Sequence, residues 1–214
     1  PIGKNDRIGI IGANGKGKST LLNCLAGELY PTEGEIVPHP SASLGHFGQT
    51  NIDRLQPDNK VIDEILRSNP SLSLQAGHSI CGAMMFDGDL SKKKVSVLSG
   101  GERSRVLLGK IISHPTNLLL LDEPSHHLDV ESIESLIEEL NDYAGALVIV
   151  THSELILKAL AKNLIIFHRD RAEFFHGDYE DFLKKVGWEG EPVVEKKMKG
   201  KMNKKEARKL RALE

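Results

Sequence analysis

The residues with the clearest chemistry form a glycine-rich stretch near the start of the chain. Residues 12–19 read GANGKGKS and fit the G-x-x-x-x-G-K-[ST] template at every fixed position. In such a stretch, backbone N–H groups and the positive end of a helix dipole converge on phosphate oxygens. Lys18 can reach the β and γ phosphates, and the Ser19 hydroxyl can ligate Mg²⁺. The stretch, called the phosphate loop below, therefore predicts a nucleotide phosphate site.

A second pair of chemical groups follows an apolar run later in the chain. Residues 118–121 are four leucines, which is typical of a central parallel strand, and Asp122 and Glu123 come directly after them. Both carboxylates should emerge at the carboxyl edge of the sheet, where the phosphate loop also lies. Asp122 can hold Mg²⁺ through its water shell, and Glu123 can orient or deprotonate an attacking water. The alternative is an ordinary acidic helix start before Pro124.

A third stretch, residues 98–102 (LSGGE), supports two compatible interpretations. Ser99 and Glu102 have the spacing of a capping box that starts a helix running to about Ser113. A helix N-terminus that carries a serine hydroxyl and the amides of Gly100 and Gly101 is also an anion site.

The elements that must position these groups follow from hydrophobic periodicity. Residues 8–11 predict a buried strand, and the leucines after the phosphate loop have helical spacing, which is the context the loop requires. Further strands are predicted at 35–37, 44–47, 118–121 and 146–150, and a hairpin at 164–167 and 172–175. Helices are predicted around 61–66, 79–86, 102–113, 133–140, 155–160 and 178–186.

Composition limits the class of protein. With 214 residues, 39% hydrophobic and 27% charged, the chain suits one α/β domain with an appendage. No apolar run approaches the roughly 18 residues of a membrane helix, which predicts a cytoplasmic protein without membrane insertion. Two cysteines, Cys24 and Cys81, are too few for a disulfide framework and are expected to be buried thiols. Since Pro1 comes so shortly before the phosphate loop, we expect a fragment of a longer polypeptide.

The C-terminal end differs in charge from the rest of the chain. Residues 195–214 contain nine Lys and Arg against three Glu, while the whole chain has a net charge of −2. Such a tail is either a solvated or disordered charged end or a contact for a phosphate backbone. Without aromatic residues, it would bind RNA by charge and not by reading bases.

The order and spacing of residues 12–19, Gln49, residues 98–102, residues 118–123 and His152 resemble those of ATP-binding-cassette (ABC) ATPases. This resemblance implies an α/β P-loop NTPase fold of ABC type, with a mostly parallel central sheet, helices on both faces and a helical subdomain at about 59–113. The cassette would span 1–188, and 189–214 would be a basic linker and the start of a helical, coiled-coil tail. By the same resemblance Gln49 lies near Mg²⁺ and the attacking water, His152 contacts the γ-phosphate, and Asp129 ends the loop that crosses to a partner cassette.

Within this family, the chain resembles most closely the ABC-F branch, which consists of soluble cassettes that act on the ribosome. The features are residues 122–129 (DEPSHHLD), residues 175–183 (FHGDYEDFL) and the basic tail. The branch usually has Thr-Asn-His-Leu-Asp after the proline and Asp after the switch histidine, so Ser125, His126 and Ser153 depart from it. This resemblance implies the C-terminal cassette of a longer protein.

The expected site binds ATP and Mg²⁺ and needs a second cassette, because in this family the signature 98–102 faces the phosphate loop of a partner. Its expected catalytic residues are Glu123, His152 and Gln49, and its expected metal ligands are Ser19, Gln49 and Asp122. The expected nucleotide-binding residues are Gly12, Ala13, Asn14, Gly15, Lys16, Gly17, Lys18, Ser19, Thr20, Ser99, Gly100, Gly101, Glu102 and Asp122. Zinc at His126, His127 and His152 is not favoured, because adjacent histidines point in different directions.

The predicted function is ATP hydrolysis that couples cassette closure to ribosome binding and translation regulation, with ribosomal RNA reached through the tail and other regions. One alternative is the ATPase subunit of a membrane transporter, docking through the segment between Gln49 and Ser99. The other is an ATP-dependent scaffold without turnover. Because the family's adenine-stacking aromatic would precede Pro1, the isolated chain is expected to bind nucleotide weakly and hydrolyse it poorly.

Overall fold

A mostly parallel sheet organises the chain, as predicted. The computed structural model describes residues 1–48, 55–126, 128–168 and 171–187. Its strands are β1 (Arg7–Gly12), β2 (Leu44–Phe47), β3 (Leu118–Asp122), β4 (Ala146–Val150), β5 (Asn163–Phe167) and β6 (Ala172–His176). They pair in the order β2-β3-β4-β1-β5-β6, and within the described residues β6, antiparallel to β5, is the exception to parallel pairing.

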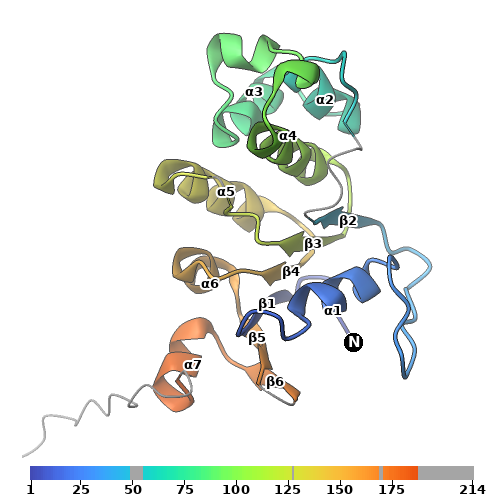
Figure 1. Cartoon of the computed structure of the whole chain (residues 1–214), viewed down its shortest axis with the longest axis vertical. Coiled ribbons are helices and arrows are strands. Elements are labelled where there is room, and N and C mark those ends of the chain that lie inside the picture. Colours follow the sequence, from blue (N-terminus) through green and yellow to red (C-terminus); the bar gives the residue numbers. More distant parts are fainter. Residues whose placement is uncertain (49–54, 127, 169–170, 188–214) are drawn as a thin grey trace, which may run out of the picture. The chain divides into compact units, whose positions relative to one another are not determined.

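Helices cover both faces of this sheet (Figure 1). The described helices of the chain are α1 (Lys18–Leu25), α2 (Val61–Ser68), α3 (Leu74–Ala83), α4 (Gly100–Ser113), α5 (Val130–Asp142), α6 (Glu154–Leu160) and α7 (Tyr179–Lys185), and those on the sheet include α1, α5 and α6. Side chains alternate along each strand, so one face of β3 and β4 packs with α5 and α6 and the other with α1. The central strands β1, β3 and β4 are thus buried on both faces, which explains why they are apolar at successive positions.

The alternation is clear in β3. Leu120 packs with Ile8, Ile10 and Leu22 on the α1 side. Leu119 and Leu121 belong instead to the larger cluster on the side of α5 and α6. Three leucines of the run that indicated a central strand, Leu119 to Leu121, are therefore fully buried, and Leu118 is partly buried on the α1 side.

Helices α2, α3 and α4 form a helical group that precedes β3 in the chain (Figure 1). A partly buried ion pair joins two of them: Lys110 of α4 donates to the buried Glu64 of α2 at 2.6 Å between Nζ and Oε2. Glu64 also accepts from the Gln56 backbone N–H at 3.0 Å and the Asn59 amide at 2.7 Å. Burial alone would raise the pKa of Glu64, but these hydrogen bonds outweigh burial and hold the pKa below its ordinary value.

Two predictions about local structure were wrong. Residues 35–37 form no strand among the described residues, and Val37 is 77% exposed. A strand needs a neighbour to satisfy its backbone groups, and the structure pairs no strand with this segment. The helix predicted from residue 79 begins at Leu74, because the Ser73 hydroxyl caps it by accepting from the Ala76 N–H at 3.1 Å.

Several sequence predictions fall on residues outside the described part of the chain: Gln49, His127, the turn at 169–170 and the basic tail. Residues 1–180 form one compact unit, and Asp181 begins a second, described only to residue 187. Of the two free thiols, Cys81 is buried as predicted, and Cys24 is only partly buried. None of the helices described has the length and apolar character needed to cross a bilayer.

Candidate active site at the carboxyl edge of the sheet

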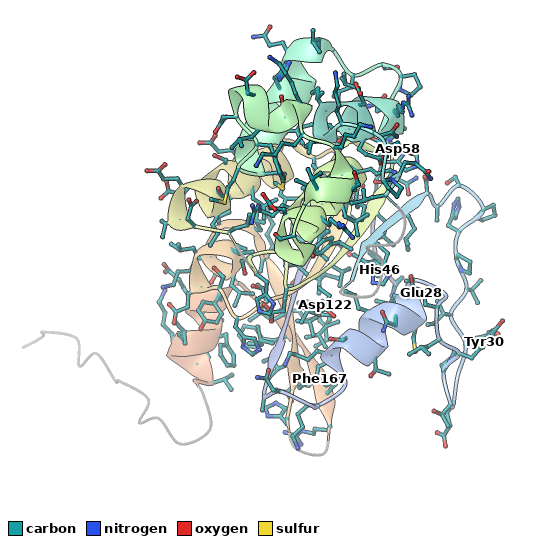
Figure 2. All side chains as sticks on the ribbon, turned by 45° about the horizontal axis from the view of Figure 1, so that its top comes forward. Glu28, Tyr30, His46, Asp58, Asp122 and Phe167 are labelled. Carbon is teal, nitrogen blue, oxygen red and sulfur yellow. The ribbon has the colours of Figure 1, made fainter. Side chains whose placement is uncertain are left out.

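Glycines shape the phosphate loop where β1 turns into α1. Gly12, Gly15 and Gly17 have φ angles of 142°, 74° and 95°, in the region that side-chain-bearing residues rarely adopt. A Cβ on Gly12 would also lie 2.5 Å from the Phe167 carbonyl oxygen of the neighbouring strand β5. Figure 2 labels Phe167 beside the loop. The template glycines are therefore required by conformation and, at Gly12, by close packing.

Lys18 folds back over the phosphate loop. Its Nζ donates to the carbonyl oxygens of Gly12 at 2.8 Å and Ala13 at 3.0 Å, and the side chain is 7% exposed. Burial lowers the pKa of Lys18, and the nearby carboxylates of Glu123 and Asp122 oppose that shift. Because neutral carbonyls leave the charge of this buried cation uncompensated, an anion bound in the loop would stabilise it.

The start of α1 is open toward the loop. Gly17 is its N-cap, and among the described residues no side chain caps the helix. The amides of the first turn are thus available to an external acceptor, while Ser19 and Thr20 are exposed. This geometry fits a phosphate group.

Parallel pairing brings the ends of four strands to the same edge as this loop. Asp122 ends β3 and is 9% exposed, Glu123 follows it, and Thr151 and His152 follow β4. β2 points the same way, so its carboxyl end leads toward Gln49, which lies outside the described residues. The sequence prediction that the acidic pair and the phosphate loop share an edge is confirmed.

Glu123 has an unusual backbone and a restrained carboxylate. Its φ is 49°, which costs a residue with a side chain roughly 1–3 kcal/mol and is concentrated at functional sites. Its backbone N–H donates to Val150 at 2.8 Å, and its side chain is 12% exposed. The His152 backbone N–H points at Oε2 from 3.4 Å, and His152 Nε2 lies 3.5 Å from Oε1.

His152 connects this carboxylate to the phosphate loop. Its Nε2 is 2.9 Å from Oδ1 of Asn14, so the imidazole touches the loop and Glu123 with one nitrogen. The sequence singled out His152 only by resemblance and had no signal for its contact with Asn14. A second imidazole, that of His126, also approaches Glu123, with Nε2 4.0 Å from Oε2.

The signature 98–102 forms the capping box that its spacing predicts. The Ser99 hydroxyl accepts from the Glu102 N–H at 3.3 Å, and the Glu102 carboxylate accepts from the Ser99 N–H at 2.8 Å. These bonds from Ser99 hold the pKa of Glu102 below its ordinary value. No hydrogen bond among the described residues joins the signature to the phosphate loop. Gly100 is exposed, and a Cβ there would meet nothing within 4 Å.

Asp129 has a structural role at the end of the turn that follows β3. Its carboxylate accepts from the Ser132 N–H at 2.9 Å and caps α5, a bond that lowers its pKa. The cap fixes the residue at which the turn ends and α5 begins. Just before it, Leu128 packs against the main core cluster.

Mg²⁺ in nucleotide sites is held by one or two carboxylates together with phosphates, which supply the remaining oxygen ligands. Asp122 and the exposed Ser19 supply protein oxygens of the required kind. The residues present therefore fit a magnesium–nucleotide complex.

Comparison with known proteins agrees with this geometry. The profile of the ABC transporter family matches residues 2–126. "Probable ATP-binding protein YheS" of Escherichia coli (strain K12) is 40% identical over 176 residues, which cover 82% of this chain and 28% of that protein. "Probable ATP-binding cassette sub-family F member 3 homolog" of Encephalitozoon cuniculi is 36% identical, covering 87% of this chain and 33% of its own length.

Among solved structures, the crystal structure of archaeal ribosomal stalk protein aP1 with the archaeal ribosome recycling factor aABCE1 matches with a TM-score of 0.72 and 25% identity. The match covers 86% of this chain and 36% of that one. A nucleotide-bound ABC dimer, in a post-hydrolysis state with ADP and Pi, matches with a TM-score of 0.65 at 20% identity, covers 83% of this chain and 88% of that one, and supports the fold.

The fold, the phosphate loop and the family profile define a P-loop ATPase domain, and the chain belongs to the ABC family. Its relatives include members of sub-family F, in agreement with the ABC-F resemblance of the sequence. The chain spans 28% of the length of the YheS protein that it matches.

Proposed function

We propose that this chain is an ATP-hydrolysing ABC-F cassette that works with a second cassette and couples ATP-driven closure to ribosome binding and the regulation of translation. The observation that carries the catalytic part is the convergence of Lys18, Glu123 and His152 at one sheet edge, with His152 Nε2 3.5 Å from Glu123 Oε1. These side chains follow three different strands, so their approach is a property of the fold and not of a local motif.

The proposed roles follow from the contacts. The open amides of the phosphate loop hold phosphate oxygens. Lys18 gives up its hydrogen bonds to the Gly12 and Ala13 carbonyls and donates to the phosphate oxygens instead. Asp122 and Ser19 would hold Mg²⁺, which neutralises charge on the phosphates when bound. Glu123 orients and deprotonates the attacking water, and His152 keeps that carboxylate beside the loop.

Gln49 and the signature complete the proposal. The role of Gln49 near the water and Mg²⁺ rests on the family resemblance, since it lies outside the described residues. The signature residues 98–102 are proposed to serve a partner's nucleotide. Ser99 and Gly100 are exposed, and the capping-box groups of Ser99 and Glu102 are already hydrogen-bonded to each other. The ribosome as partner, and with it a cytoplasmic location, is supported by the sub-family F relatives and by the likeness to the archaeal recycling factor.

The catalytic part is tested by the substitution Glu123→Gln in the full-length protein. Turnover of Mg-ATP should fall about 100-fold or more, the typical effect of losing a general base, while ATP binding is retained. Glu154→Gln, on an exposed helix start, is the matched control and should leave turnover unchanged. Turnover near wild type in Glu123→Gln would refute the role of Glu123.

The need for a second cassette is tested with the isolated chain. If two copies must meet, specific activity should be low and rise with protein concentration. Robust turnover that is independent of concentration would contradict the composite site.

Co-sedimentation of Glu123→Gln with ribosomes in ATP and in ADP tests the coupling of closure to ribosome binding. The proposal predicts stronger association with ribosomes in ATP than in ADP.

A further inference from the structure

The turn between β3 and α5 presents a second histidine to the catalytic carboxylate. His126 Nε2 lies 4.0 Å from Glu123 Oε2, while His152 Nε2 lies 3.5 Å from Oε1. The two imidazoles are 58% and 52% exposed, and the carboxylate between them is 12% exposed. Each oxygen of Glu123 therefore has its own imidazole, from a different loop.

The position of His126 is set by the turn. Its backbone N–H donates to the Glu123 carbonyl at 3.1 Å, and the Leu128 N–H donates to Ser125 at 3.1 Å. Pro124 is buried, and beyond Leu128 the turn ends at the Asp129 cap of α5. Both ends of the turn are thus anchored, and His126 has a fixed place beside the carboxylate.

We propose that His126 is a positioning residue for Glu123, holding Oε2 so that Oε1 faces the attacking water. The proposal rests on the ATPase function proposed above. A separation of 4.0 Å suits an ion pair with a protonated imidazole or one bridging water. Either supplies a donor to an oxygen that, among the described residues, is otherwise approached by the His152 N–H from a long 3.4 Å.

The arrangement also links the carboxylate to the next part of the fold. The turn that carries His126 leads to Asp129 and helix α5, whereas His152 follows β4 and touches Asn14 of the phosphate loop. Glu123 is therefore held between the phosphate loop and the start of α5. Lys18 also interacts with this carboxylate: the charge of Glu123 raises the pKa of Lys18 against the lowering effect of burial.

Two substitutions in the full-length protein separate the donor chemistry of His126 from its shape. His126→Phe keeps a ring without a donor, and His126→Gln keeps a donor without a ring. We expect kcat to fall about 10-fold in His126→Phe with KM for ATP within about twofold, the lower end of the effect of losing a group that orients another side chain of the site, and His126→Gln to retain most activity. His78→Ala, at an exposed position of α3, is the control.

A second measurement excludes a merely structural role. In the Glu123→Gln background, His126→Phe should cause no further loss of residual turnover, because its effect acts through the carboxylate. Equal activity of His126→Phe and wild type, or an additive loss in the double variant, would overturn the inference and leave the proposed function standing. Absence of Mg-ATP turnover in the wild type would overturn both.

Discussion

The phosphate loop and the start of helix α4 are both anion-binding shapes made of glycine and a helix N-terminus, yet they are stabilised in different ways. The phosphate loop depends on residues distant in sequence: Phe167 packs against Gly12, and Lys18 is buried near the carboxylates that follow β3. The start of α4 depends on a reciprocal bond pair between Ser99 and Glu102.

This difference fits the two halves of a composite site. A loop that binds its own nucleotide can draw on the sheet edge around it. A signature that serves a partner has to stay accessible before the partner binds. Hydrogen bonds contained within a single turn keep it folded without covering it. A further ion pair at the far end of α4, between Lys110 and the buried Glu64, supports this helix from a distance.

Removing that distant support should have the largest effect on stability. Lys110→Met leaves the Glu64 carboxylate, 2% exposed, without its charged partner and should cost about 3 kcal/mol of unfolding free energy. The control Lys158→Met breaks the exposed pair with Glu154 and should cost less than about 1 kcal/mol. Urea unfolding of both variants measures the contrast, and similar small losses would contradict it.

The same pair should make stability depend on acid pH. Because the pKa of folded Glu64 lies below its ordinary value of 4.5, its stabilising contribution is complete above that pH and is lost as pH falls through the lowered pKa. In Lys110→Met the first of the lowering hydrogen bonds is absent, so burial pushes the pKa of folded Glu64 back up toward or past its ordinary value. The loss of stability on acidification should therefore become smaller or reverse. Urea midpoints followed into the acid range test the shift, and parallel pH curves for the two proteins would refute it.

Two glycine substitutions compare the two anion sites directly. Gly12→Ala combines a φ of 142° with a Cβ 2.5 Å from the Phe167 carbonyl oxygen and should destabilise the fold by about 2 kcal/mol. Gly100→Ala meets nothing within 4 Å and should change thermal stability little or raise it by up to about 1 kcal/mol. Gly100→Ala should nevertheless lower turnover in the full-length protein if the signature contacts a partner's nucleotide. Unchanged turnover would count against that contact.

A loss of stability smaller than that of Gly12→Ala is expected at the helix cap. Ser99→Ala removes one bond of the capping box and should cost about 1 kcal/mol. Thermal unfolding of the isolated chain measures this loss. A loss several times larger would mean that tertiary contacts, and not the local box, hold the signature.

Local structure was largely predictable because its causes lie within a few residues. The phosphate loop, the leucine run before Asp122 and the capping box at Ser99 each form where their spacing predicts. The false strand at 35–37 shows the limit of the same reasoning. Its residues have strand character, but strand formation depends on a neighbour that no local pattern specifies.

By itself, the sequence determined which groups could do chemistry and on which kind of element each stands, because glycine conformation, caps and hydrophobic period act over one or two turns. Only the tertiary structure decided which groups meet. The order of the strands places His152 between the phosphate loop and Glu123 and brings Phe167 against Gly12. The turn after β3 brings His126 to the carboxylate of Glu123. These contacts depend on strand pairing and on where a turn is anchored, and both are fixed by packing across the whole sheet.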